Sequence, residues 1–380
     1  MRRPYTLIAG DFVDTGGMDR ANLALAHWLA RQGGPVRLVA HRVADVLLGF
    51  PNVRFVRVPK PGNAYLLGEP LLEAVGRAWA LRTRAEGGRV LANGGNCPVP
   101  AANWVHYVHG AYVPQPAGGA LRRLKGRVSH RVYLRGERQA LRHARVIIAN
   151  SERTREDLVA ATGVPASRVR VVYYGCDAER FRPASMEARR AAREALGWPE
   201  SRRVALFVGA LGDRRKGFDT LFEAWARLCA RGDWGIDLKV VGVGTQREAW
   251  AREVEARGLG ARIQFLGFRR DVPLLMSAAD LLVAPTRYEA YGLGVHEALC
   301  AGLPALVSRA SGVAERYPAA LEGLLLDDPD DVDGLVRRLQ VWREHEAAWA
   351  PKVAALSETL RTQHWDGMAA SIADIMEREG

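Results

Sequence analysis

Two glutamates, Glu289 and Glu297, stand in a segment whose composition suits the binding of a phosphorylated sugar. They flank Gly292 and Gly294, and a short apolar run at 281–284 precedes them. Glycines at a helix start allow close backbone approach, and the free N–H groups of the first turn attract phosphate. Carboxylates accept hydrogen bonds from vicinal sugar hydroxyls. The alternative is a loop glutamate that caps the helix and a solvated helix glutamate, and the spacing alone does not separate the two interpretations.

The consecutive Arg215 and Lys216 form a second candidate group, after an apolar run and the glycine Gly209. The planar fork of an arginine holds two phosphate oxygens, and a lysine adds a compact point charge. We therefore expect this pair to neutralise a departing diphosphate. A basic loop that is only solvated is the alternative.

Two weaker signals lie in the first half of the chain. The pair Gly16-Gly17 separates an apolar run from a helical pattern, so its backbone can approach the same phosphates. His109 ends the run 104–108 and precedes a glycine, although a single histidine is more often structural. Both are candidates because of their positions after predicted strands.

The elements that position these residues are predicted by alternating patterns. Short β-branched runs, each followed by a glycine-containing loop and a helical pattern, recur in both halves, as in parallel βαβ units of an α/β fold. The expected strands of the first half are 6–9, 36–40, 53–58, 90–92, 104–108, 146–149 and 169–173, with a helix at 19–32. Those of the second half are 204–208, 238–241, 263–266, 281–284 and 305–307.

A break at 181–184 predicts two domains, 1–183 and 184–362, which suits the length of 380 residues. Two doubly wound sheets in tandem predict a central cleft between the carboxyl ends of their strands, where open α/β folds bind ligands. The acidic cluster 327–331 is expected to cap a helix that begins near Val332.

Taken together, these segments resemble the retaining glycosyltransferases of family 4, which have the GT-B fold of two Rossmann-like domains. The resemblance follows chain order through Gly16-Gly17, 108–110, 148–152, 174–177, 215–217, 242–244 and the Glu289/Glu297 pair. It also implies that residues 363–380 form a closing helix that crosses back to the N-terminal domain.

The resemblance implies a role for each matching residue. Glu297 would bind the ribose, Arg215 and Lys216 would neutralise the diphosphate, and His109 would lie on the acceptor side of the reacting sugar. Glu289 would hold the transferred sugar and distal phosphate with the backbone of Ala290, Tyr291, Gly292 and Leu293, while Phe268 would border the base and Gly16, Gly17 and Gly209 would complete the donor site. One departure is Ala210, where many members carry arginine; Arg214 or Arg215 is expected to substitute.

The function that the resemblance implies is retaining transfer of a hexose-type sugar from a nucleotide diphosphate to a hydroxyl acceptor, whether a glycan, a lipid-linked molecule or a small molecule. Because a diphosphate is a good leaving group, fixed cations and N–H dipoles suffice to stabilise it, so neither a metal nor another cofactor is expected. A sugar-nucleotide epimerase or phosphorylase on the same fold is the alternative.

Composition excludes some other classes. The chain is 48% hydrophobic and 25% charged, and no apolar run approaches the ~20 residues of a membrane span. The first apolar run meets Asp11 too early for a secretory signal, so a cytoplasmic protein is expected. The four cysteines are far apart and form no C-x-x-C pair, which indicates neither a disulfide framework nor a zinc site.

The net charge of +12 invites a polyanion partner, but only five of the 54 basic residues are lysines, and an arginine bias from base composition explains the charge equally well. No nucleic-acid module is evident, so no nucleic-acid partner is expected. The arginine-rich segment Arg122 to Arg145 is interleaved with apolar residues. It predicts either an amphipathic surface that rests on the anionic inner face of a membrane or a solvated helix over the N-terminal core.

Overall fold

The computed structural model describes residues 3–115, 120–212 and 214–380. The side chains of residues 120–123 are also outside the description, which removes Arg122 and Arg123 from the predicted basic segment. The chain divides into two compact units. The first holds the residues up to Val113 together with Lys125–Gly175 and Gln363–Gly380, and the second holds Pro114–Leu124 and Cys176–Thr362.

The first unit is built on a parallel sheet of strand order β5-β3-β1-β6-β7-β8-β9. Its strands are β1 (Tyr5–Ile8), β3 (Val36–Ala40), β5 (Val53–Arg57), β6 (Arg89–Asn93), β7 (Ala102–Val105), β8 (Val146–Ala149) and β9 (Val169–Val171). A small parallel pair, β2 (Asp11–Phe12) and β4 (Arg42–Val43), extends beyond it. Most strand residues are buried, which explains why they read as continuous apolar runs.

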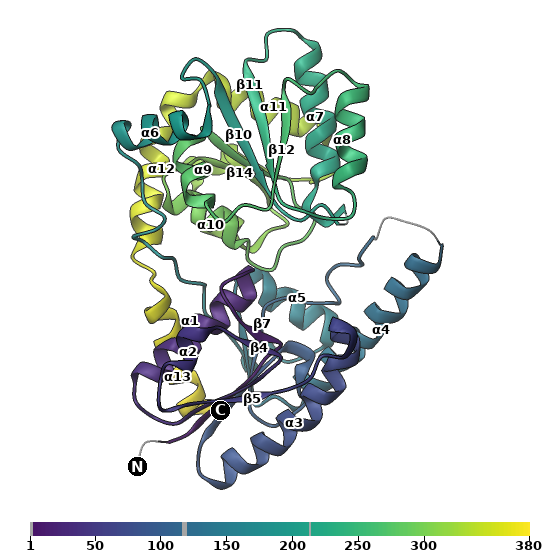
Figure 1. Cartoon of the computed structure of the whole chain (residues 1–380), viewed down its shortest axis with the longest axis vertical. Coiled ribbons are helices and arrows are strands. Elements are labelled where there is room, and N and C mark those ends of the chain that lie inside the picture. Colours follow the sequence, from purple (N-terminus) through teal and green to yellow (C-terminus); the bar gives the residue numbers. More distant parts are fainter. Residues whose placement is uncertain (1–2, 116–119, 213) are drawn as a thin grey trace. The chain divides into compact units, whose positions relative to one another are not determined.

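Helices cover both faces of this sheet. They are α1 (Gly17–Arg31), α2 (Asp45–Leu48), α3 (Tyr65–Ala85), α4 (Ala120–His143), α5 (Glu152–Thr162) and α13 (Trp365–Glu379), with short 3-10 turns η1 (Pro61–Asn63), η2 (Gly94–Asn96) and η3 (Ala166–Arg168). Helices α1 and α13 pack together on one face, and α3 lies on the other (Figure 1). Among the described residues, no helix combines the length and apolarity needed to cross a bilayer.

The second unit repeats the architecture with a parallel sheet of order β12-β11-β10-β13-β14-β15. Its strands are β10 (Arg203–Val208), β11 (Ile236–Val241), β12 (Ile263–Gly267), β13 (Leu281–Ala284), β14 (Ala305–Ser308) and β15 (Leu325–Leu326). Its helices are α6 (Met186–Leu196), α7 (Phe218–Ala230), α8 (Arg247–Ala256), α9 (Val272–Ala278), α10 (Leu293–Cys300), α11 (Val332–Glu344) and α12 (Glu346–Arg361), with 3-10 turns η4 (Arg214–Lys216), η5 (Gly312–Arg316) and η6 (Ala319–Leu324). Helix α11 packs on α7 and α12 on α10, so both faces are covered (Figure 1).

The doubly wound α/β class predicted from the sequence is confirmed. The bounds of two strands differ most from the prediction. The strand expected at 104–108 is present as β7 but ends at Val105, so His109 does not lie at its end. The strand expected at 169–173 is present as β9 but ends at Val171. Residues beyond Val105 leave the sheet because the backbone turns to donate to a buried side chain of α4, as described below. The acidic cluster 327–331 does cap a helix, since the Asp331 side chain accepts from the Gly334 N–H at 2.8 Å at the start of α11.

The compact units divide at Gly175, whereas the sequence placed the boundary after residue 183. The intervening segment belongs with the second unit because Cys176 and Phe181 are buried in its core. The first unit takes up the chain again at Gln363, and α13 is tied to it by ion pairs. Glu377 accepts from Arg3 at 2.7 Å and from Tyr5 at 2.7 Å, and Glu379 pairs with Arg170 at 2.6 Å.

Candidate active site

Two neighbouring loops of the second unit carry most of the candidate residues, and a third loop lies beside them. The two loops follow β10 and β13 and the third follows β14, and these strands lie side by side in the sheet in the order β10-β13-β14. Because parallel strands end at one edge of the sheet, the loops that follow them meet there. The sequence therefore brings the basic loop after β10 next to the acidic loop after β13.

Arg215 and Lys216 converge on the carboxylate of Glu289. The Arg215 Nη1 donates to Glu289 Oε2 at 2.9 Å and to the carbonyl of Tyr288 at 3.1 Å, and Lys216 Nζ forms an ion pair with the same carboxylate oxygen. The three charged side chains are about one quarter exposed. Two cations and one anion thus share a half-buried position at the ends of adjacent strands.

The charge state of Glu289 follows from this contact. Burial by itself would raise the pKa of its carboxyl, but the charges of Lys216 and Arg215 and their hydrogen bonds outweigh burial and hold the pKa below its usual value. Glu289 is therefore an ionised acceptor at neutral pH. A sugar hydroxyl can donate to it without any proton transfer.

Backbone contacts lock the basic loop onto the acidic one. The Arg287 N–H donates to the Arg215 carbonyl at 2.8 Å, and the Thr286 hydroxyl donates to the same carbonyl at 2.9 Å. Gly217 caps α7 with φ 71°, and a Cβ built there would lie 1.8 Å from the Pro285 carbonyl oxygen. Only glycine fits such an approach in the left-handed region, so the position of Lys216 depends on the next residue being glycine.

The loop after β13 is also fixed to the loop after β14. The Gly312 N–H donates to the Glu289 carbonyl at 3.0 Å, and the Val313 N–H donates to the Tyr291 carbonyl at 2.6 Å. Gly292 caps α10 with φ 102°, a conformation that L side chains rarely adopt. Helix α10 begins at Leu293, and the amides of its first turn face outward from the helix end, where an anion is stabilised.

The other predicted donor residues of the second unit lie on or beside this loop. Glu297 is one turn into α10 and 6% exposed, so it is a buried side chain and not the solvated glutamate of the alternative interpretation. Ala290, Tyr291 and Leu293 are buried; the first two lie in the loop between β13 and α10, and Leu293 is the first residue of α10. Phe268 is 60% exposed beyond the end of β12, and Gly209 directly follows β10, where its N–H donates to Val241 O at 2.9 Å.

The two arginines left open by the sequence have different partners. Arg214 donates to Asp219 at 2.6 Å, whereas Arg215 reaches Glu289. The side chain of Arg287 is 9% exposed and forms ion pairs with both Asp219 and Asp330. Asp330, a member of the acidic cluster 327–331, is therefore a partner of this arginine. The sequence did not predict this network, because it joins residues that are far apart in the chain: Asp219 in the first turn of α7, Arg287 after β13 and Asp330 after β15.

In the first unit, Gly16 caps α1 with φ 90° and Gly17 begins the helix. The paired glycines thus form a strand-to-helix turn, as predicted. Asp19 lies in the first turn, and burial together with the charge of Asp11 raises its pKa to about 7. A carboxylic acid that holds its proton near neutral pH sits next to the predicted glycine loop.

His109 lies four residues beyond β7 in a turn held by Glu137 of α4. Its backbone N–H donates to Glu137 Oε1 at 3.0 Å, and its ring stacks on Tyr133 with centroids 5.2 Å apart. Burial and the neighbouring His130 lower the pKa of His109 to about 4, so the ring is neutral at pH 7. Burial raises the pKa of Glu137 to about 7, against the lowering effect of the backbone N–H groups of His109 and Gly110.

Glu137 was not predicted as a site residue. In the sequence it is the single acidic residue of the arginine-rich segment Arg122 to Arg145, and this was the feature that could have marked it as a candidate. Two cysteines that the sequence treated as isolated, Cys176 and Cys300, are also brought together in the second unit beside His296.

Comparison with solved structures defines the class. WaaG, a glycosyltransferase involved in lipopolysaccharide biosynthesis, superposes with a TM-score of 0.73 at 23% identity over 98% of this chain and 100% of its own. Anabaena HepE in complex with UDP and glucose superposes with a TM-score of 0.70 at 22% identity over 99% of each chain. The fold is that of the GT-B glycosyltransferases.

Sequence comparison gives the family. Residues 15–180 match the model of Glycosyltransferase Family 4, and residues 188–360 match that of Glycosyl transferases group 1. The chain therefore belongs to the glycosyltransferases of family 4. The D-inositol 3-phosphate glycosyltransferase of Corynebacterium urealyticum is 32% identical over 252 residues, which span 63% of this chain and 58% of that relative.

Proposed function

We propose that the protein transfers a hexose-type sugar from a nucleotide diphosphate to a hydroxyl acceptor with retention of anomeric configuration and without a metal at the diphosphate. The observation that carries the proposal is the convergence of Arg215 and Lys216 on Glu289 at the ends of adjacent strands. Two fixed cations beside a helix N-terminus match the charge that develops on a departing diphosphate.

The two cations suit the departure of the phosphate as well as the binding of the donor. As the bond between the anomeric carbon and the phosphate oxygen breaks, negative charge grows on that oxygen, and Arg215 and Lys216 are already in place to stabilise it. Their paired anion, Glu289, then accepts from hydroxyls of the sugar. Glu297, buried on α10, is proposed to accept from the ribose.

Retention requires that the acceptor attack from the face that the phosphate leaves. In the proposed step, the acceptor oxygen bonds to the anomeric carbon while its proton passes to the departing phosphate oxygen, so atoms and charge balance without a protein base. The neutral ring of His109 is proposed to contact the acceptor side of the sugar as a hydrogen-bonding group and not as a proton carrier at pH 7.

The donor and acceptor are tested by direct assay. HepE was solved with UDP and glucose, and the relative from Corynebacterium is named for an inositol phosphate, so UDP-sugars and D-inositol 3-phosphate are the first compounds to screen. We expect nucleotide diphosphate release only when donor and acceptor are both present, with turnover unaffected by EDTA. Proton NMR of the product should show the anomeric configuration of the donor.

Two results would refute the proposal. Diphosphate release of equal rate without any acceptor would indicate an epimerase or hydrolase, and a product of opposite configuration would exclude retention. Loss of all turnover in EDTA, with recovery on addition of Mg²⁺ or Mn²⁺, would exclude a metal-independent diphosphate site.

We also propose that α4 rests on an anionic membrane surface. Leu124, Val128 and Val132 are exposed at four-residue spacing, and Arg131 and Arg135 lie in the neighbouring exposed row. An apolar row beside a basic one is typical of a helix that lies in the lipid interface. Vesicles that contain anionic lipid should retain the protein at low salt, and the double variant Arg131→Glu/Arg135→Glu should not bind; equal binding of both proteins would exclude the surface.

A further inference from the structure

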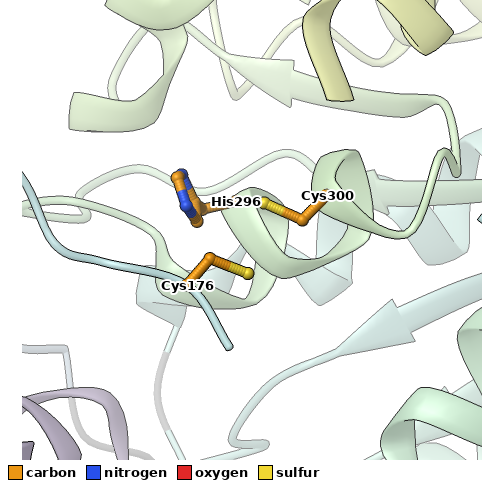
Figure 2. Close-up of side chains that lie close together, drawn as sticks. All are labelled: Cys176, His296 and Cys300. Atoms are coloured by element: carbon orange, nitrogen blue, oxygen red, sulfur yellow. The ribbon is translucent and has the colours of Figure 1, made fainter. Parts of the chain in front are cut away.

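Cys176, His296 and Cys300 form a buried cluster in the second unit. One potential ligand atom from each of the three side chains lies within 4.8 Å of the other two. Figure 2 shows His296 and Cys300 projecting from α10, with Cys176 facing them from a separate segment. All three residues are at most 2% exposed. The cluster is therefore shielded from solvent on every side.

The local fold explains why the three side chains meet. His296 and Cys300 are four residues apart on α10, so they lie on one face of the helix, one turn from each other. Cys176 begins the long segment of the second unit, Cys176–Thr362, and is part of the unit's hydrophobic core, as is Cys300. Nitrogen and sulfur donors are thus gathered inside an apolar surrounding.

The histidine ring is held in place on one side only. Its Nδ1 hydrogen-bonds with the Tyr291 hydroxyl at 2.8 Å, whereas its Nε2 is buried, and the ring's further interaction is with the Cys300 thiol, a weak donor. A buried ring nitrogen that faces only weak thiol donors is poorly satisfied, and such groups call for an explanation. A hydrogen bond from a neighbouring side chain to the other ring nitrogen is the usual support of a metal-binding histidine.

We propose that Cys176, Cys300 and His296 bind one soft d¹⁰ cation, Zn²⁺ or Cu⁺. Thiolate and imidazole are the ligands that these ions prefer, and the three residues supply none of the oxygen ligands on which Mg²⁺ and Ca²⁺ depend. With Zn–S near 2.3 Å and Zn–N near 2.0–2.1 Å, ligand atoms around one zinc are roughly 3.5–3.8 Å apart. Ligand atoms that lie within 4.8 Å of one another therefore need to approach by about 1 Å to bind one zinc.

Charge balance separates the two ions. Each thiol releases its proton as its sulfur–metal bond forms. Two thiolates with Zn²⁺ give a neutral site, and with Cu⁺ they give one negative charge. Zinc in structural sites takes four ligands, which would require one further ligand beside the three. Measured stoichiometry and affinity for each ion decide between them.

The bound ion would join two parts of the second unit. It would fasten the segment that begins at Cys176 to α10, the helix that begins at Leu293 and carries Glu297. This site is separate from the cations that the proposed function places at the diphosphate, and it does not depend on that function. Its role is to hold the position of α10.

The experiment uses the full chain, purified under reducing conditions and stripped with a chelator. It is titrated with Zn²⁺, with Cu⁺ against a competing Cu⁺ chelator, and with Co²⁺ as an optical probe. We expect one equivalent of Zn²⁺ or Cu⁺ per chain, thiolate-to-cobalt charge-transfer bands in the near ultraviolet, and a rise in melting temperature on metal addition. Thiol counting after denaturation establishes that both cysteines are reduced.

Matched variants distinguish the site from adventitious thiol binding. Cys176→Val keeps an apolar side chain in the core and should fold while losing roughly 100-fold or more in metal affinity. Cys97→Val removes a buried cysteine of the first unit and should leave the titration unchanged. His296→Leu should abolish the cobalt bands as Cys176→Val does.

Three outcomes would overturn the proposal. If the wild type binds each ion no more tightly than Cys176→Val does, or if the cobalt bands persist in that variant, the three side chains pack in the core without binding a metal ion. Equal loss in Cys97→Val would show unspecific binding. A Cys176–Cys300 disulfide found by mass spectrometry in protein purified without reductant, and unable to take up metal after reduction, would identify a redox pair instead.

Discussion

Replacement of Lys216 by methionine is the sharpest test of the proposed donor site. The substitution keeps an unbranched apolar stem and removes the ammonium group that pairs with Glu289. Both side chains are about one quarter exposed, and Arg215 remains in contact with the carboxylate at 2.9 Å. The fold should therefore survive, with a loss of stability of about 1 kcal/mol or less.

The expected kinetic loss is much larger than the loss of stability. A hydrogen bond to a charged group contributes about 1.5–3 kcal/mol, and each 1.36 kcal/mol is tenfold, so the contact corresponds to roughly 10- to 150-fold. Loss of a fixed donor aimed at growing negative charge usually costs about 100- to 1000-fold in kcat. We therefore expect a fall in kcat of about 100-fold or more, and partial recovery in Lys216→Arg, which restores a cation.

The assay is nucleotide diphosphate release under saturating donor and acceptor, with melting temperature measured on the same samples. Lys352→Met, at an exposed lysine of α12, is the matched control and should behave as wild type. If Lys216→Met turns over within about threefold of wild type while its melting temperature is unchanged, Lys216 does not stabilise the leaving group and the reasoning is refuted.

Three further predictions concern neighbouring residues. Arg215→Leu should reduce kcat about as strongly as loss of the lysine, whereas Arg214→Leu should cost at most about tenfold because its guanidinium pairs elsewhere; equal losses in diphosphate release would contradict the assignment. Glu137 has a folded pKa raised to about 7, so it contributes stability that is full below its unfolded pKa and lost as pH rises through 7. Urea unfolding should show a decline in the free energy of unfolding between pH 5 and 8 in wild type, to which Asp19 also contributes, and Glu137→Gln should make this decline smaller; a decline of unchanged size in the variant would exclude Glu137 as a cause. Gly217→Ala should lower the free energy of unfolding by about 2 kcal/mol or more, from left-handed strain and the carbonyl clash, while Gly212→Ala, with open space around it, should be nearly neutral.

Much of the fold could be predicted because buried parallel strands are short apolar runs. The bounds predicted for β3, β8 and β13 coincide with those observed. The predicted end of β7 was wrong because an apolar run does not show where the backbone leaves a sheet. There the N–H of His109 is taken by Glu137, a partner 28 residues away that local pattern does not reveal.

The sequence predicted where the candidate site lies in the fold, but not which of its side chains contact one another. Strand ends located Arg215 and Glu289 on neighbouring loops, but which arginine reaches the glutamate depends on the turn at Gly217. The contact between Cys176 and Cys300 was the hardest to predict from the sequence. The two residues are far apart in the chain, and the packing of the core of the second unit brings them together.

The return of α13 to the first unit has a consequence for biosynthesis. Residues that complete the first unit follow the whole of the second in the chain, since Gln363–Gly380 belongs with the strands of the N-terminal half. At about 5–20 residues per second, a ribosome needs roughly 10–40 s to make the intervening segment. During that interval α1 lacks the helix on which it packs, and Arg3, Arg89 and Arg170 lack their carboxylate partners. The half that is synthesised first is therefore expected to finish folding last, and to depend most on chaperones while it waits.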